Sequence, residues 1–299
     1  MKPLVIYHKS CVDGAMAAAV AYLRFGEEAD YVSASYQRDS VSLDRAVGAE
    51  VYILDFSFPR ADLLALADVA ARVVVADHHK TSAWLKEMSH PKVEVVFGAE
   101  ECGASLADRF FGGPGESEYD AVAYARDYDL WRHEMPDSKA VHAYFYSFLD
   151  GTSEEVRVFA RHLSRRSDAQ EWIVEGNAIL RANLQQARRL AKHPEIVTFA
   201  GIEAPAVNSP VFQNDVCDFL AAASPIGVGI CWGYRQGRYK VSLRSRPVSG
   251  KEEIFDCSAV AAIYGGGGQR GAAGFECDRL PWEEDDAFIA FHKSRKETP

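Results

Sequence analysis

The stretch Arg72–Lys80 reads RVVVADHHK, and it decides how the rest of the chain is interpreted. Its three consecutive valines, Val73–Val75, are β-branched, and such a run is typical of a strand buried on both faces in a parallel sheet. The strand leads into Asp77, His78 and His79. Ligands of open α/β sheets bind just beyond the carboxyl ends of the strands, so the motif places a carboxylate and two imidazoles at such a position. Taken alone, the motif is explained equally well as a polar strand end.

Two other predicted strands end in the same way. Leu4–His8 (LVIYH) ends in His8 and is followed by Asp13, and Val51–Asp55 (VYILD) ends in Asp55. Three apolar strands therefore each deliver ligand-type residues at one end, which predicts a shared site at the carboxyl edge of a sheet. Carboxylates and imidazoles together suit Mn²⁺, Mg²⁺, Co²⁺ or Zn²⁺. Two such ions, about 3.5–4 Å apart, would bind phosphate oxygens and activate a water for attack on phosphorus.

Length, charge and cysteine content limit the classes of function. The 299 residues leave room for two domains, and 48% hydrophobic with 25% charged residues is an ordinary globular composition. The formal net charge of −10 argues against a protein that coats long duplexes, which needs a broad basic surface. None of the six cysteines forms a C-x-x-C pair, and scattered thiols indicate a reduced, cytoplasmic protein. No apolar run is long and continuous enough to predict a signal peptide or a membrane span.

Strands alternate with helical segments over the first half of the chain, which predicts a doubly wound, mostly parallel sheet. Beyond about residue 138 the pattern becomes helical, and Glu154–Lys192 is rich in good helix formers. We interpret this region as a connector between two lobes; its helices would otherwise simply extend the first domain. Short predicted strands then indicate a smaller α/β domain. The expected boundaries are 1–150 for the catalytic domain, 151–194 for the connector and 195–299 for the second domain.

The order of the motifs resembles the DHH phosphoesterase superfamily. H-x-x-C-x-D-G at 8–14, L-D-F-S at 54–57, D-H-H-K-T at 77–81 and D-Y-D-L-W at 127–131 follow the superfamily's order. GGGGQRGAAGF at 265–275 resembles the glycine-rich signature of the DHH-associated C-terminal domain, so the resemblance spans nearly the whole chain. Relatives include nanoRNases, RecJ exonucleases, cyclic-dinucleotide phosphodiesterases and family II pyrophosphatases.

The resemblance implies roles for the residues of the first domain. Asp55 would bridge two metal ions, Mn²⁺ in the first place with Mg²⁺ or Co²⁺ as alternatives. The implied metal ligands are His8, Asp13, Asp55, His78 and Asp129, and Asp127 is the alternative to Asp129. The catalytic triplet would be Asp77, His78 and His79, in which Asp77 orients its neighbours and His79 contacts the scissile phosphate. Cys11 stands where many members carry another aspartate, and it is either a thiolate ligand or a packing residue.

The second domain carries the residues expected to bind substrate, in a cleft between the two domains. Consecutive glycines allow close backbone approach to an anion, which singles out Gly266, Gly267 and Gly268, with Gln269 where many relatives have histidine. The segment 232–251 contains six basic residues and no acidic one, and its V-S-L-R-S at 241–245 matches the associated domain's substrate strand. Arg244 is therefore the predicted phosphate anchor.

The expected function is a metal-dependent phosphodiesterase for short oligonucleotides or dinucleotides. One alternative is a phosphatase for a small nucleotide such as a 3′,5′-bisphosphate. Another is a nucleotide-binding sensor with weakened catalysis, which is motivated by Cys11 and Gln269. The expected partner is the short nucleotide substrate rather than a membrane or a long duplex, and assembly as a homodimer is left open.

Overall fold

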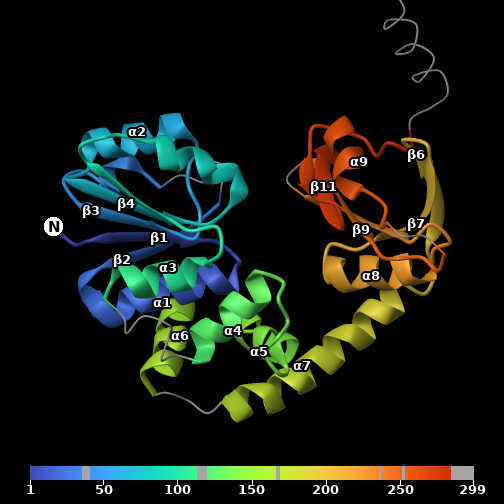
Figure 1. The fold of residues 1–299 in the computed structure, drawn as a ribbon, viewed down its shortest axis with the longest axis horizontal. Helices are drawn as coiled ribbons and strands as arrows, with labels where there is room; N and C mark the ends of the chain where they lie inside the picture. The colour runs from blue at the N-terminus through green and yellow to red at the C-terminus, as the bar shows by residue number, and fades with distance from the viewer. Residues whose placement is uncertain (36–40, 113–119, 166–168, 236, 251–252, 284–299) are drawn as a thin grey trace, which may run out of the picture. The chain divides into compact units, whose positions relative to one another are not determined.

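The computed structural model describes residues 1–35, 41–112, 120–165, 169–235, 237–250 and 253–283. It divides the chain into two compact units, Met1–Leu180 and Arg181–Pro299 (Figure 1). Each unit is built on one sheet in the described residues, of five strands in the first unit and six in the second. Within those same ranges, no helix combines the length and the apolar character that crossing a membrane requires.

The sheet of the first unit is parallel throughout, as the sequence predicts. Its strands are β1 (Leu4–His8), β2 (Asp30–Ala34), β3 (Glu50–Leu54), β4 (Arg72–Asp77) and β5 (Val93–Phe97). Their order is β2-β1-β3-β4-β5. The chain therefore leaves β1 toward β2 and then returns to the other side of β1 with β3. Such a reversal of strand order is the position at which open α/β sheets bind ligands.

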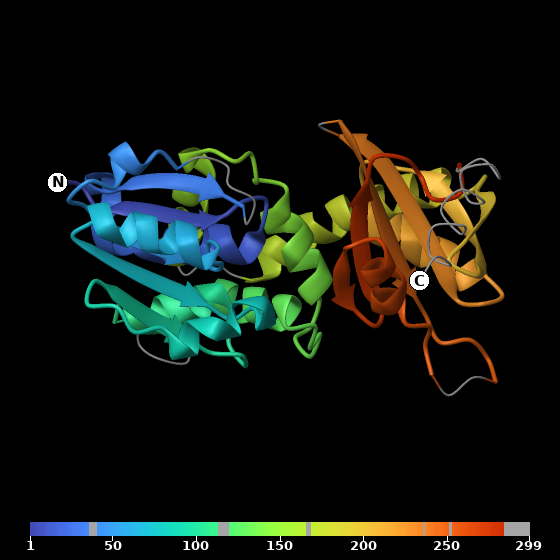
Figure 2. The same ribbon diagram turned by 90° about the horizontal axis from the view of Figure 1, so that it is seen from above.

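Alternate residues of these strands fill two separate cores, one on each face of the sheet. Val74 and Ala76 belong to one core, whereas Val73 and Val75 belong to the other. Helix α2 (Arg60–Val69) contributes to the second core and covers that face (Figure 1), which faces the viewer in Figure 2. The first core is completed by α1 (Val12–Phe25), α3 (Gly103–Phe110), α4 (Asp120–Asp129), α5 (Ser138–Tyr146) and α6 (Ser153–Arg165). Full burial of each valine contributes about 1.5–3 kcal/mol.

Small residues let α1 lie close to the sheet. Its alanines Ala15, Ala17, Ala18 and Ala19 are fully buried, and α1 contacts both α3 and α6. A Cβ added at Gly14 would lie 2.5 Å from the carbonyl oxygen of His8, so the start of α1 presses directly on the end of β1. This approach holds the start of α1, which carries Asp13, at the carboxyl end of the sheet.

Two helices, and not one, occupy the long helical region. Helix α6 ends at Arg165, and α7 spans Ala169–Leu190. The Tyr7 hydroxyl donates a hydrogen bond of 2.7 Å to Glu155 Oε1 on α6. Trp172 on α7 is 1% exposed and lies in the core that covers one face of the first sheet. Short 3-10 turns complete the unit: η1 (Gly26–Glu28), η2 (Leu43–Arg45) and η3 (Lys80–Glu87).

The second unit carries a sheet of order β10-β11-β9-β8-β7-β6, in which only β7 and β8 are parallel neighbours. Its elements are β6 (Glu195–Phe199), β7 (Ile202–Asn208), α8 (Gln213–Ala223), β8 (Val228–Arg235), β9 (Arg238–Ser245), α9 (Cys257–Ile263), β10 (Gly267–Gln269) and β11 (Ala272–Cys277). The sequence did not indicate α8, whose N-cap is Phe212 without a side-chain cap. Usual start signals are Ser, Thr, Asp or Asn at this position.

Candidate metal centre

Asp55 lies at the centre of the site, directly after β3. Its backbone adopts φ = 67°, a left-handed conformation in which Asp is tolerated better than most side chains. The side chain is 1% exposed. Its Oδ2 lies 3.2 Å from His8 Nδ1, and its Oδ1 lies 3.2 Å from His78 Nε2. One buried carboxylate therefore contacts the imidazoles at the carboxyl ends of β1 and β4, the two strands next to β3 in the sheet.

Two groups of ligand-type side chains share Asp55. One consists of His8, Asp55 and His79, and the other of Asp13, Asp55 and His78. In each group, one nitrogen or oxygen of every residue lies within 4.8 Å of the others. A carboxylate that belongs to both groups has the placement of a bridging ligand between two ions.

Asp13 is fixed by the start of α3. Its Oδ2 accepts a hydrogen bond of 2.5 Å from the backbone N–H of Gly103, and its Oδ1 accepts one of 2.9 Å from that of Ala104. Helix N-termini favour negative charge, so this position stabilises a carboxylate. A Cβ at Gly103 would collide with the Cβ of Asp55. Glycine at this position therefore lets α3 approach both carboxylates, a requirement that the sequence motifs did not reveal.

The two aspartates of D-Y-D-L-W have different surroundings. Asp129 Oδ2 lies 3.4 Å from His78 Nε2, beside the two groups. Asp127 Oδ1 instead accepts hydrogen bonds from the backbone N–H groups of Glu134 at 2.8 Å and Met135 at 3.3 Å. Of the two alternatives, the structure therefore brings Asp129 to the site and leaves Asp127 to hold the loop after α4.

Asp77 contacts the two histidines that follow it. Its Oδ1 accepts from the backbone N–H of His78 at 2.7 Å and that of His79 at 3.0 Å. The same oxygen lies 2.8 Å from His79 Nδ1. Burial opposes the protonation of His79, but the hydrogen bond with Asp77 and the charge of Asp55 outweigh it and raise the pKa of the imidazole. Asp77 thus orients His79 and favours its protonated form, from outside the group around Asp55.

The electrostatics of the site favour a bound cation. Burial raises the pKa of Asp13, and the charges of Asp55 and Asp129 raise it further. Burial and the charge of Asp55 likewise raise the pKa of Asp129. Burial also works against ionised Asp55, yet hydrogen bonds from His78 and His8 hold its pKa well below the usual range. A divalent ion such as Mn²⁺ fits this cluster, because it would offset the repulsion among the carboxylates and accept this mixture of oxygen and nitrogen donors.

Comparisons with known proteins identify the fold. No protein-family model matches the chain. An uncharacterized protein of Acanthamoeba polyphaga mimivirus is 26% identical over 311 residues, which cover 95% of this chain and 70% of the viral protein. A solved DHH domain, from a protein described as a member of a family of ribosomal proteins, matches with a TM-score of 0.61 and 16% identity, over 99% of this chain and 87% of that one. The chain has the DHH-superfamily fold.

Two further solved structures share the DHH fold with this chain. One is the pGpG-specific phosphodiesterase PggH of Vibrio cholerae, with a TM-score of 0.51 and 11% identity, over 99% of this chain and 98% of that one. The other is RecJ of Thermus thermophilus in complex with Mn²⁺, with a TM-score of 0.51 and 18% identity, over 98% of this chain and 51% of RecJ. At these identities the likeness establishes the fold.

Cys11 differs from its neighbours in the DHH motifs. It is half-buried and is the N-cap residue of α1, and neither of the two groups found among the described residues includes it. Burial raises the pKa of its thiol, and the charges of Asp55 and Asp13 raise it further. Cys11 therefore lies at the rim of the site, where it lines a pocket beside Asp13 and its raised pKa favours the thiol over the thiolate.

The predicted substrate residues of the second unit lie on strands at one edge of its sheet. Gln269 on β10 pairs with Ala272 on β11, which in turn pairs with Arg244 on β9. Residues directly opposite each other on antiparallel strands share a face, so Gln269 and Arg244 stand on one face with only a methyl group between them. Gly267 lies two residues before Gln269 on β10, opposite Gly274.

The glycine run forms a strand and not the loop that its composition suggests. Gly267 and Gly268 belong to β10, the edge strand of the sheet in the described residues, and Gly266 directly precedes it. A Cβ at Gly266 would collide with the backbone of β11, and Gly268 has φ = 143°. Edge strands leave one row of backbone amides unpaired, so this edge keeps N–H groups that an anion can approach.

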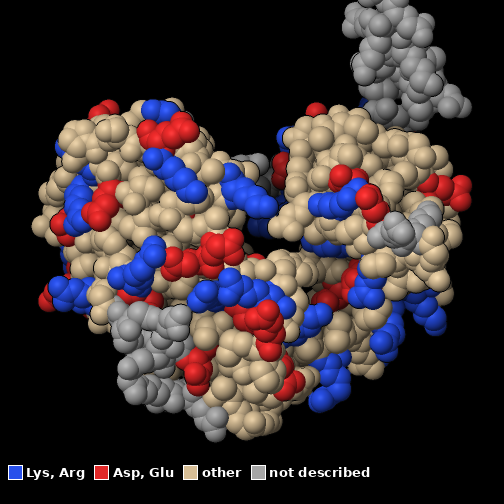
Figure 3. All heavy atoms as spheres, viewed as in Figure 1, with Lys and Arg blue, Asp and Glu red and all other residues tan. Residues whose placement is uncertain are grey.

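The basic segment is partly neutralised by acidic residues from elsewhere in the unit. Arg238 lies 3.8 Å from Glu276 and 3.3 Å from Asp278, and Arg246 pairs with Asp218. Arg244 instead donates to the carbonyl of Leu243 at 2.8 Å and to the side-chain oxygen of Asn214. These hydrogen-bond partners are uncharged, so they do not neutralise the positive charge of Arg244. Over the face of the first unit seen in Figure 3, basic and acidic side chains are interspersed.

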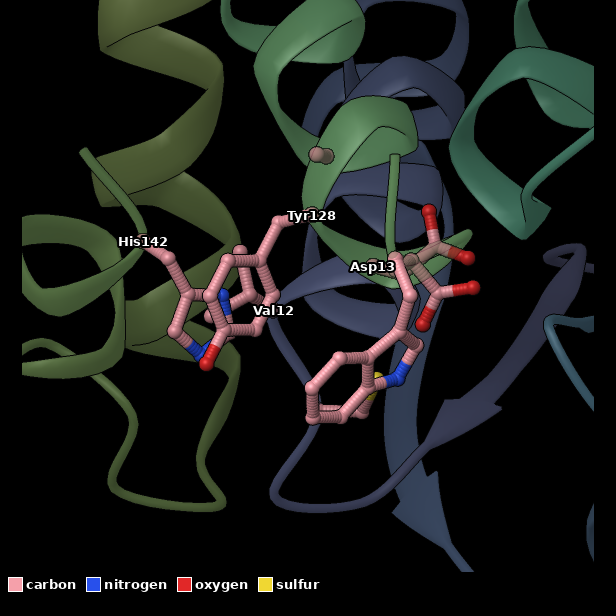
Figure 4. A pocket seen from close by; sticks show the side chains of 8 residues that line it. Val12, Asp13, Tyr128 and His142 are labelled. Carbon is pink, nitrogen blue, oxygen red and sulfur yellow. The ribbon is translucent and has the colours of Figure 1, made fainter. Parts of the chain in front are cut away.

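One feature of the first unit was missed by the sequence motifs. A small pocket of about 80 Å³ lies against the metal centre and is lined by Cys11, Val12, Asp13, Ala125, Tyr128, Asp129, Trp131 and His142. His142 belongs to none of the motifs. Its ring stacks on Tyr128 with centroids 3.5 Å apart, which is a packing role (Figure 4). The signal for this pocket in the sequence was Trp131, the large aromatic residue that ends D-Y-D-L-W.

Proposed function

We propose that this protein is a metal-dependent phosphodiesterase that hydrolyses short oligonucleotides or dinucleotides with two Mn²⁺ ions. The observation that carries the proposal is Asp55, shared by two groups of ligand-type side chains. The solved structures that share the fold support it, since they include a pGpG-specific phosphodiesterase and a RecJ protein with Mn²⁺. Free cysteines throughout both units agree with a reduced, cytoplasmic setting.

The residues of the first unit would divide the work. His8, Asp13, His78 and Asp129 would hold the two ions together with Asp55. When bound, the ions would polarise the phosphate and supply a hydroxide at neutral pH. His79 lies in the group of His8 and Asp55, but Asp77 holds it through Nδ1 and its pKa is raised. We therefore assign it to donate a hydrogen bond to an anionic phosphate oxygen rather than to bind an ion.

The second unit would capture the part of the substrate that does not react. Arg244 is a cation whose hydrogen-bond partners are uncharged, and Gln269 shares its face of the sheet. An arginine fork binds phosphate in a bidentate manner, and an amide can bond either a phosphate or a base edge. A substrate with a second phosphate or a second nucleoside would use these contacts.

A product profile tests the proposal. The purified protein would be stripped of metal with a chelator and reconstituted with Mn²⁺, Mg²⁺ or Co²⁺. Each form would be incubated with pAp, cyclic dinucleotides, and RNA and DNA of 2 to 24 nucleotides. We expect hydrolysis of 2- to 5-mers only in the metal-loaded forms, with mononucleotide products. Hydrolysis of pAp alone would assign the site to a phosphatase. Nucleotide binding without turnover in any metal would leave a sensor.

A further inference from the structure

The pocket against the metal centre has two chemically different sides. Asp13 and Asp129 form one side, and both belong to the candidate metal centre. Tyr128 and His142 form the other side, and Trp131 also lines the pocket. Figure 4 shows the rings of Tyr128 and His142 on one side of the pocket and Asp13 on the opposite side. A ligand in this pocket would therefore meet carboxylates that bind metal at one end and flat aromatic faces at the other.

The aromatic side is preorganised. The rings of Tyr128 and His142 lie 3.5 Å apart with an interplanar angle of 9°. Trp131 stacks obliquely on Tyr128, at 6.5 Å and 27°, and meets the edge of His133 at 5.5 Å. Burial, with the charge of His133 second, lowers the pKa of His142 to about 4. His142 is therefore a neutral ring at physiological pH, so it adds no charge to this wall.

Trp131 is presented to solvent at a conformational cost. The residue is 61% exposed, and its backbone adopts φ = 56°, in the left-handed region that bulky side chains rarely occupy. The loop around it is held by Asp127, whose carbonyl accepts from Arg132 N at 2.9 Å and whose carboxylate accepts from Glu134 N at 2.8 Å. Strain that the surroundings enforce in this way is concentrated at functional sites.

We propose that this pocket is a nucleobase subsite, in which the indole of Trp131 stacks on the base of the nucleotide whose phosphate lies at the metal centre. The inference rests on the proposed function and extends it from the reacting phosphate to the neighbouring base. Aromatic side chains bind bases through their π faces without hydrogen-bond readout, so the subsite would accept purines and pyrimidines alike. A sugar or a free phosphate alone would not use the aromatic wall.

The occupant follows from the continuity of the pocket with the metal centre. Asp13 and Asp129 line the pocket, and both also lie at the candidate metal centre next to His78. The nucleoside attached to a phosphate bound at that centre would therefore lie within reach of the pocket. A protein surface docking on Trp131 would not require the carboxylates on the opposite side. The experiment below distinguishes such protein docking from binding of a base.

The decisive measurement compares kcat/KM on three deoxydinucleotides. One carries both bases, and each of the other two carries a tetrahydrofuran abasic residue at one position. Trp131→Ala should lower kcat/KM on the intact dinucleotide by about 5- to 160-fold, mainly through KM, since stacking contributes about 1–3 kcal/mol per base. The loss should disappear on one of the abasic dinucleotides. Trp131→Phe should restore most of the activity. Val174→Ala, which truncates a side chain on α7 that is as exposed as Trp131 (61%) but lies outside the pocket, should behave as wild type.

A second readout is independent of turnover. Tryptophan fluorescence of the metal-loaded wild-type protein should be quenched by AMP and not by ribose 5-phosphate, and Trp131→Phe should abolish that quenching. Quenching in a protein without hydrolytic activity would support the base subsite while refuting the phosphodiesterase. Equal losses of Trp131→Ala on intact and both abasic dinucleotides would overturn the base subsite and indicate a structural or docking role. The same conclusion would follow from AMP quenching that persists in Trp131→Phe.

Discussion

The two sheets hold their polar residues in opposite ways. In the first unit, Asp13, Asp55 and Asp77 are at most 2% exposed and are fixed by backbone turns, helix ends and buried strands. In the second unit, Gly267, Gly268 and Gln269 are exposed on an edge strand, and Arg244 is half-buried against Asn214. The first arrangement fixes charges that repel one another, and the second leaves groups free to adapt to a ligand.

This difference indicates which part of a reaction each sheet can control. Buried, mutually repelling carboxylates need rigid supports and a cation, so changes there should affect every substrate equally. Under the proposed function, the exposed amides and Arg244 of the second unit would contact only substrates that are long enough to reach them, so changes there should depend on the substrate. Substitutions at five places test this division.

The largest effect is expected from Asp55→Asn. Asn tolerates the left-handed backbone of Asp55, but it removes the charge that serves both ligand groups. Turnover should fall by about 10³-fold or more on dinucleotides and on bis-p-nitrophenyl phosphate, because metal ions supply several kcal/mol of charge stabilisation. Asp108→Asn is the matched control, since Asp108 is also buried, at 3% exposure, but contributes to neither group. Retention of activity in Asp55→Asn would refute the two-metal mechanism.

Arg244→Ala should distinguish the two sheets. We expect a loss of about 2–3 kcal/mol in transition-state binding, or about 30- to 160-fold in kcat/KM, on a dinucleotide. Hydrolysis of bis-p-nitrophenyl phosphate should be nearly normal, because this compound has no second phosphate. Arg246→Ala removes a neighbouring arginine that is already paired with Asp218, and it serves as the control. Equal losses of Arg244→Ala on both substrates would instead assign Arg244 to folding.

The pair Asp129→Asn and Asp127→Asn tests the division of roles within D-Y-D-L-W. Asp129→Asn should shift the Mn²⁺ activation curve to about 10- to 100-fold higher concentration, the range found even for residues next to metal ligands. Asp127→Asn keeps the side-chain oxygen that accepts from Glu134 and Met135, so its curve should match that of wild type. The reverse pattern would make Asp127 the ligand.

Gly103→Ala should act through packing. The added methyl group would collide with Asp55, and overpacking of this kind costs about 1–3 kcal/mol of the free energy of unfolding. Gly271→Ala is the control, because its Cβ would meet Ile254 at an ordinary 3.4 Å. Urea unfolding would measure both variants, and turnover should fall only in Gly103→Ala. Unchanged stability and turnover would show that α3 does not constrain Asp55.

The smallest effect is expected from Cys11→Ser. Cys11 belongs to neither ligand group in the described residues, and its thiol has a raised pKa. The Mn²⁺ activation curve should therefore stay the same. A shift of about 10-fold or more would make Cys11 a thiolate ligand after all.

The sequence predicts the parts of the molecule that depend on local pattern. The valines of β4 and the apolar runs of β1 and β3 identify the parallel sheet, and the residues that follow these strands identify the candidate metal centre. The close approach of Gly103 and the pocket of Trp131 and His142 depend on contacts between distant segments. Strand β10 is a further case, because it lies within a run of glycines, and only its pairing with β11 makes it a strand.

The hydrogen bond between Tyr7 and Glu155 has a consequence for how the protein is made. All five strands of the first sheet are complete once Phe97 has been synthesised, yet the side chains that close one of its faces arrive much later. Glu155 satisfies the Tyr7 hydroxyl, and Trp172 fills the same core. Because domains fold as units during synthesis, the nascent sheet must wait for these residues before its core can close. During that interval part of the apolar face of the sheet lacks its cover, and hydrophobic surface exposed in this way makes a folding chain prone to aggregate.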